Sequence, residues 1–199
     1  MPLSPRIALD VAILLPPHIS ARATELSAAL PKGESQGLCL GDDYLPHITL
    51  TQQFVRTEDL EAALGHAHAV LIGREALHVA VSGGGRGRSS VWMTIEPTPS
   101  LLDLHAALMD ALLPFELPQA SSAAFIDSEA RAQDITWVAN YRRESSFGAF
   151  APHVTLGHAA NPPAVEPLTF TATTVAACHL GKFCSCRRVL RRWSLGSEA

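Results

Sequence analysis

The sequence repeats one short pattern, PHITL at residues 46–50 and PHVTL at residues 152–156. Each copy alternates polar and apolar residues, as a strand does when one face lies in the core and the other outside it. The polar pairs that share a face are His47 with Thr49 and His153 with Thr155. Residues two apart on a strand lie about 7 Å apart, so both side chains of a copy can reach one phosphate-sized group.

Two facing histidines favour acid–base chemistry over a structural role. A single strand histidine is more often structural, but the copies fall near the middle of each half of the chain, as two related lobes across a cleft would place them. Imidazole titrates near neutrality, so one ring can be neutral while the other is protonated. The neutral ring takes a proton from water, and the charged ring gives one to a leaving oxygen. The threonine hydroxyls can bind the phosphate oxygens, which carry the charge in the transition state.

Length and charge narrow the function classes. The chain has 199 residues, of which 47% are hydrophobic and 17% charged, with a formal net charge of −4. This predicts one domain over residues 1–199 and argues against a protein that holds double-stranded DNA by charge. The apolar run at 7–17 contains Asp10 and ends in two prolines, so it is too short to span a membrane and lacks a signal-peptide cleavage site. We therefore expect a cytoplasmic protein with no membrane segment.

Helices and strands are predicted to be intermixed along the chain. Helical spacing predicts helices within 16–33, 56–73 and 98–114. Apolar or alternating runs predict strands at 6–16, 37–55, 76–81, 90–95, 151–159 and 167–196, with a glycine loop at 82–88 and a long irregular segment at 115–151. Because no G-x-G-x-x-G follows the first strand, a nucleotide-binding Rossmann fold is rejected. An α+β fold with mostly antiparallel sheet fits this order.

The segment CHLGKFCSC at 178–186 offers three thiols and His179 within nine residues. Zinc sites usually pair ligands from two separate places in the chain, and this cluster has no partner cluster. The sequence therefore favours reduced cysteines and no metal.

The extended stretches PHITLTQQF and PHVTLGH resemble the two signatures of the 2H phosphoesterase superfamily. That family includes 2′-5′ RNA ligase-like proteins and RNA or nucleotide cyclic phosphodiesterases. The resemblance implies a bilobal α+β fold with two pseudo-symmetric lobes, helices packed outside, and both motifs on central strands lining a central cleft. It also implies hydrolysis of a 2′,3′-cyclic phosphate without metal or cofactor. By motif match, His47 and His153 are the catalytic pair and Thr49 and Thr155 hold the phosphate, while the assignment of acid and base stays open.

Six further residues are candidate substrate contacts, namely Tyr44, Phe54, Trp92, Phe150, Arg86 and Arg88. The aromatic residues could stack on a base, and the two arginines of the glycine loop could reach a phosphate. A core or solvated role is the alternative for each of them. His158 is left out, because strict alternation from His153 puts it on the opposite face of the strand.

Alternatives from other classes remain. The same histidines would serve an RNA end ligase or a 2′-5′ phosphodiesterase. A non-catalytic module that binds a nucleotide or RNA end, or an inherited scaffold, is less consistent with four intact His and Thr positions. The expected partner is a small cyclic nucleotide or an RNA 3′ end, bound by a monomer.

Overall fold

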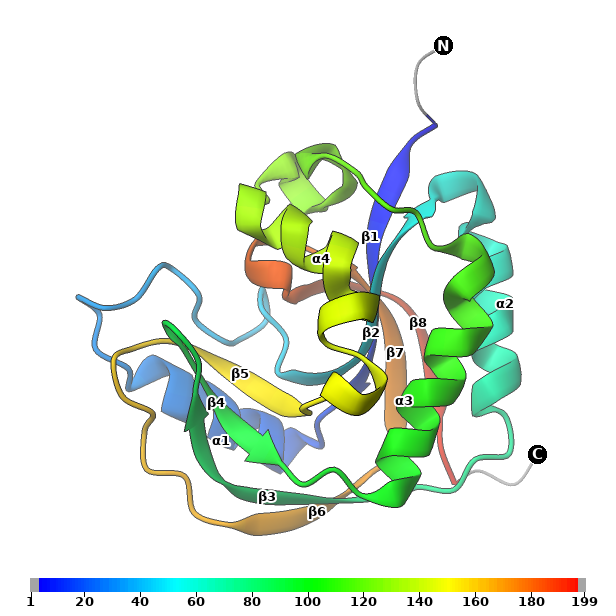
Figure 1. The fold of residues 1–199 in the computed structure, drawn as a ribbon. Helices are drawn as coiled ribbons and strands as arrows, with labels where there is room; N and C mark the ends of the chain where they lie inside the picture. Colours follow the sequence, from blue (N-terminus) through cyan, green and yellow to red (C-terminus); the bar gives the residue numbers. More distant parts are fainter. Residues whose placement is uncertain (1–3, 197–199) are drawn as a thin grey trace.

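Two four-stranded antiparallel sheets form the framework of the protein (Figure 1). The structure is a computed structural model and describes residues 4–196. Sheet A has the order β2-β1-β7-β8, from β1 (Arg6–Leu14), β2 (His47–Arg56), β7 (Thr174–Leu180) and β8 (Cys186–Ser194). Sheet B has the order β5-β4-β3-β6, from β3 (Leu77–Arg86), β4 (Ser90–Ile95), β5 (His153–His158) and β6 (Leu168–Ala172). The predicted α+β class, with one sheet in each lobe, is confirmed.

Four helices cover these sheets (Figure 1). They are α1 (Pro17–Ala28), α2 (Leu60–Leu71), α3 (Pro99–Leu112) and α4 (Ala132–Glu144). Helix α1 packs on β5, α2 and α3 pack on each other and on β2, and α4 packs on β2. The helix α3 buries Leu101, Leu104, Leu108 and Leu112, the face that helical spacing predicts. Apolar side chains of both sheets and of α1, α2 and α3 belong to one continuous core, so the two sheets are joined by buried surface.

The motif strands β2 and β5 are edge strands, each at one end of its own sheet. The expectation that both motifs lie on central strands is therefore wrong in terms of sheet order. The two edges instead lie against each other, so the motifs are central to the molecule while remaining at the edges of their sheets. This junction brings together two polar strand faces that are far apart in sequence.

Three predictions of local structure need correction. Residues 132–144 form α4, where we expected only an irregular segment. The helix starts where the Arg131 backbone N–H donates to the Asp134 carboxylate, and it buries Val138 and Tyr141. The glycines at 83–85 belong to β3 and pair with β4, rather than forming a loop. Residues 37–40, which we predicted as strand, lie outside the strands.

Among residues 4–196, no helix combines the length and the apolar character that crossing a bilayer requires.

Candidate active site

Each motif contains a β-bulge at its fifth residue, the leucine. In β2, Leu50 is the extra residue, because Thr51 pairs with Val11 and Thr49 pairs with Ala12. A bulge inserts one residue and so shifts the alternation of faces by one position. Asp10 therefore pairs with Gln52, and Gln52 shares the face of Thr49.

The second motif has the same irregularity. Leu156 is the extra residue of β5, because Gly157 pairs with Val91 and Thr155 pairs with Trp92. His158 then shares the face of His153 and Thr155, and our expectation that it points the other way is wrong. The sequence HVTLGH thus places three polar side chains on one face, as HITLTQ does with His47, Thr49 and Gln52. The bulges had no clear signal in the sequence, apart from Gly157, which adopts a positive φ of 149°.

A helix side chain donates to the bulged peptide in each motif. The hydroxyl of Ser27 in α1 donates to the Leu156 carbonyl at 2.6 Å, and Nδ1 of His105 in α3 donates to the Leu50 carbonyl at the same distance. Bulged residues lose their ladder partners, so these donors satisfy carbonyls that would otherwise be unpaired. His105 also accepts from the Phe147 backbone N–H at 2.8 Å, which connects β2 to the segment leading into β5.

The two motif histidines make equivalent hydrogen bonds. Nδ1 of His47 donates to the Leu45 carbonyl at 2.6 Å, and Nδ1 of His153 donates to the Ala151 carbonyl at 2.7 Å. A ring whose Nδ1 carries the hydrogen has its lone pair on Nε2 when neutral. Both rings are therefore fixed in the tautomer that presents Nε2 for proton transfer.

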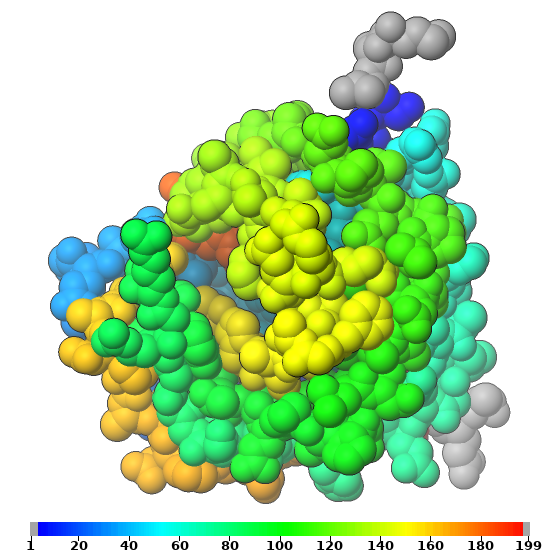
Figure 2. Space-filling model, viewed as in Figure 1, coloured from blue at the N-terminus to red at the C-terminus, as the bar shows by residue number. Residues whose placement is uncertain are grey.

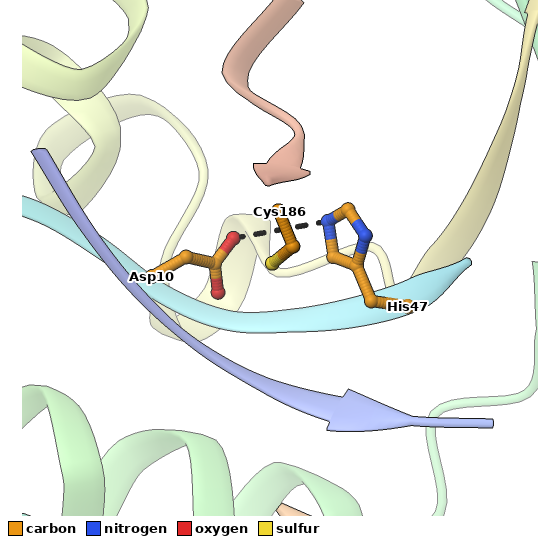
Figure 3. A group of neighbouring side chains, drawn as sticks. All are labelled: Asp10, His47 and Cys186. Atoms are coloured by element: carbon orange, nitrogen blue, oxygen red, sulfur yellow. Dashed lines mark ion pairs between the residues drawn. The ribbon is translucent and has the colours of Figure 1, made fainter. Parts of the chain in front are cut away.

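A buried carboxylate lies behind the first motif, whereas His153 has no ion pair among residues 4–196. Oδ2 of Asp10 accepts from Thr49 Oγ1 at 2.9 Å and from Gln52 Nε2 at 2.8 Å, and it lies 3.9 Å from Nε2 of His47 (Figure 3). Burial raises the pKa of Asp10, while the positive charge of His47 and these two donors oppose that rise. The first motif therefore has an acidic side chain beside its imidazole.

The second motif is electrostatically different. Burial lowers the pKa of His153, the hydrogen bond to Ala151 partly offsets this, and the nearby charge of His47 lowers it further. His153 is therefore neutral at neutral pH. The Thr155 hydroxyl makes no hydrogen bond within residues 4–196, in contrast to Thr49, whose hydrogen is directed at Asp10. Thr155 is the hydroxyl that is available to a ligand.

Aromatic side chains border this site, and two of them are tryptophans. The Trp92 ring lies 5.0 Å from that of His153, where it shares the face of Thr155. Trp137, on the unpredicted helix α4, is 45% exposed, and its Nε1 donates to Gln52 Oε1 at 3.0 Å. Figure 2 shows a hollow on this side of the molecule, between α4 and the β3–β4 turn, with β5 along its floor.

The remaining predicted contacts lie in varied surroundings. Phe54 is fully buried against Phe125, so its ring is not available to a substrate in this conformation. Phe150 stacks on His105 with ring centroids 3.8 Å apart. Tyr44 is half-buried under the Arg187 guanidinium, Arg86 donates to the Ala160 carbonyl at 2.7 Å, and Arg88 is exposed.

The three thiols of segment 178–186 and His179, which we weighed as a metal site and did not favour, form no metal-ligand group among the described residues. Nε2 of His179 is hydrogen-bonded to the Ala124 carbonyl at 2.9 Å. Cys186 instead lies beside Asp10 and His47, and together these residues are the group with metal-ligand spacing in the described part of the chain (Figure 3).

Comparisons with known proteins identify the family and the fold. The family model described as the 2'-5' RNA ligase superfamily matches residues 15–180. No protein with a curated description matches the chain. Among solved structures, E. coli LigT complexed with phosphate has 20% identity and a TM-score of 0.62, and the match covers 98% of this chain and all of LigT.

Two further structures show the same fold. E. coli LigT complexed with 3'-AMP has 20% identity and a TM-score of 0.63, over 96% of this chain and 99% of LigT. The protein TT0787 of Thermus thermophilus has 18% identity and a TM-score of 0.60, over 97% of this chain and all of TT0787. Because the family model matches most of its length, the chain belongs to the 2'-5' RNA ligase superfamily, whose members are 2H phosphoesterases.

Proposed function

We propose that this protein is a metal-independent phosphodiesterase that hydrolyses the 2′,3′-cyclic phosphate of a nucleotide or an RNA end. The observation that carries the proposal is the matched pair of histidines on two packed edge strands, each with Nδ1 bonded to a backbone carbonyl. In this tautomer, Nε2 of one ring can accept a proton while Nε2 of the other donates one.

We assign the two roles from the surroundings of each ring. Since burial lowers the pKa of His153, this ring is the general base. His47 has the buried Asp10 carboxylate 3.9 Å from its Nε2, so in this proposal it is the general acid. Water loses a proton to His153 as its oxygen bonds to phosphorus. The bond from phosphorus to the 2′ or 3′ oxygen breaks, and His47 protonates that oxygen.

The hydroxyls also differ in role. Thr155 donates to a non-bridging phosphate oxygen, where charge accumulates in the transition state. The Thr49 hydroxyl can donate to the phosphate only when Asp10 is protonated, because it otherwise donates its hydrogen bond to the Asp10 carboxylate. Thr155 is therefore the principal phosphate donor in this proposal.

The choice of a nucleotide rests on the rings near the histidines. Trp92 and the exposed Trp137 offer flat surfaces on which a base can stack. LigT has been crystallised with ATP and with 3'-AMP, which supports a small nucleotide as ligand for this fold.

Incubation with 2′,3′-cyclic AMP tests the proposal, with the product followed by phosphorus NMR. We expect a single monophosphate in the presence of EDTA. His47→Ala and His153→Ala should each lower kcat by about 10²- to 10⁴-fold. His18→Ala is the control, because His18 is exposed on α1. Near-normal turnover by either motif variant would contradict the two-histidine mechanism.

The family description favours one further candidate, cleavage or formation of a 2′-5′ RNA linkage at the same site. A 2′-5′-linked dinucleotide offered in the same assay separates the two activities. Tight binding of 3′-AMP without turnover of either substrate would indicate a binding module instead.

A further inference from the structure

Three strands of sheet A bring a carboxylate, an imidazole and a thiol to one point (Figure 3). Asp10 comes from β1, His47 from the start of β2, and Cys186 from the start of β8. Their candidate ligand atoms all lie within 4.8 Å of one another. Asp10 and Cys186 are fully buried, and the His47 side chain is 11% exposed. Oxygen, nitrogen and sulfur from these residue types are the ligands that zinc takes in proteins.

The backbone holds His47 over Cys186. The Leu45 N–H donates to the Cys186 carbonyl at 3.0 Å, and the Leu45 carbonyl accepts from Nδ1 of His47. A histidine that ligates a metal usually donates its other ring N–H to a carbonyl in this way. The ring is therefore already oriented with Nε2 toward Asp10, at 3.9 Å.

Asp10 carries an independent sign of a missing partner. Its Oδ1 is buried and has no hydrogen-bond donor, although Oδ2 has two. Within residues 4–196, the one ion pair of Asp10 is with His47, and neither lysine nor arginine reaches it. A buried carboxylate without a full set of partners is costly, and a cation would relieve that cost.

We infer that Asp10, His47 and Cys186 form a zinc site, and that zinc bound there inhibits the protein by occupying Nε2 of His47. Tetrahedral zinc, with bonds of about 2.0–2.3 Å, needs ligand atoms about 3.5 Å apart, so the group must contract by about 1 Å. His47 is the least buried of the three side chains, so we expect its ring to make most of this shift. Binding displaces the thiol proton of Cys186 to solvent. The inhibitory half of this inference rests on the proposed function, whereas zinc binding itself does not.

Cobalt(II) titration of the metal-free full-length chain tests binding without reference to activity. We expect one equivalent to bind with the visible bands of tetrahedral cobalt and a near-ultraviolet thiolate-to-cobalt band, both removed by added zinc. Cys186→Ser should remove the thiolate band and weaken zinc binding by at least the ~10- to 100-fold that loss of an outer-shell partner costs. Cys184→Ser is the matched control, because Cys184 lies two residues away and outside the group, and it should retain the band. Circular dichroism checks that each variant is folded.

Absence of stoichiometric binding by the wild-type chain, or an unchanged thiolate band in Cys186→Ser, would overturn the site. For inhibition, each variant is compared with its own metal-free rate on 2′,3′-cyclic AMP. Zinc should lower the wild-type rate reversibly, with EDTA restoring it, and should affect Cys186→Ser only at a concentration at least ~10- to 100-fold higher. Binding without inhibition would overturn the inhibitory role. A chain that binds cobalt through the thiolate but hydrolyses nothing would refute the proposed function and leave the zinc site standing.

Discussion

Oδ2 of Asp10 lies 3.9 Å from Nε2 of His47, and no equivalent carboxylate accompanies His153 among residues 4–196. The distance is too long for a hydrogen bond, so Nε2 is not committed to the carboxylate. It is short enough for the charge of either group to favour the opposite charge on the other. Two near-identical sequence motifs are thereby made chemically unequal, as the proposed acid and base roles require.

Asp10→Asn should impair the acid while leaving the base intact. Asparagine keeps an oxygen that can accept from Thr49 and Gln52, but it carries no negative charge beside His47. We expect kcat/KM on 2′,3′-cyclic AMP to fall by about tenfold or more, yet by less than in His47→Ala. Measurement of kcat/KM on the folded variant checks this, and a value equal to that of the wild type would show that Asp10 has a structural role alone.

The acidic limb of the rate profile should report His153. Burial lowers the pKa of this base below its usual value of 6.5, so it becomes protonated only at more acidic pH. We therefore expect kcat/KM to persist at pH 6.5 and to decline below it. A profile of kcat/KM between pH 4.5 and 9 measures this. An acidic limb centred above pH 6.5 would refute the assignment of His153 as the base.

Trp137 should contribute to binding the base. Its ring is 45% exposed, and its N–H donates to Gln52 on the face of the first motif. Trp137→Ala should raise KM for a cyclic nucleotide by the equivalent of about 1–3 kcal/mol of stacking, with little change in kcat. Trp137→Phe keeps a ring and loses the N–H, so it should restore part of the affinity. Equal KM values for Trp137→Ala and wild type would remove Trp137 from the binding surface.

The sequence predicted the polar faces of β2 and β5 because alternation depends only on residue type and a period of two. The same alternation gave the wrong face for Gln52 and His158, because a bulge shifts the alternation of faces by one residue. The bulge at Leu50 is fixed by His105, whose hydrogen bond crosses from another element and leaves no local pattern.

Other parts of the site were missed for related reasons. Helix α4 is stabilised by packing on β2, and it buries few apolar residues, so its periodicity is weak. Asp10 interrupts an apolar strand, and nothing in that strand indicates that Gln52 and His47 will pair with it. Contacts between distant strands are decided by tertiary packing, which a reading of local propensity does not include.

Gly85 should be indispensable to the position of Trp92. The indole ring of Trp92 lies across β3 at this point, and a Cβ at residue 85 would be 2.2 Å from its Nε1. Gly85→Ala should displace the indole from His153, lower stability by about 1–3 kcal/mol and change the tryptophan fluorescence. Gly65→Ala, in α2, has open space at its Cβ and should instead stabilise by up to about 1 kcal/mol. Urea unfolding of both variants measures the contrast, and equal effects would contradict the packing argument.

His105 should couple stability to pH through the bulge of the first motif. Its Nδ1 donates to Leu50 and its Nε2 accepts from Phe147, so the ring must be neutral, and burial lowers its pKa. Above pH 6.5 the ring is neutral in both folded and unfolded chains. Below pH 6.5 the unfolded chain binds a proton that the folded chain does not, so stability falls as the pH falls.

His105→Phe keeps a ring to stack on Phe150 but leaves the Leu50 carbonyl and the Phe147 N–H unpaired. It should cost about 1–3 kcal/mol at pH 7.5. The free energy of unfolding should also fall less between pH 7.5 and 5.5 than it does in wild type. The contribution of His105 to this fall is lost in the variant, whereas the contributions of the other buried histidines remain. Urea unfolding at both pH values measures the two free energies. Ser27→Ala, which removes the corresponding donor to Leu156, is the matched control: it should be destabilising and keep the wild-type pH dependence. If His105→Phe also kept the wild-type pH dependence of stability, the neutral His105 ring would not be the source of that dependence.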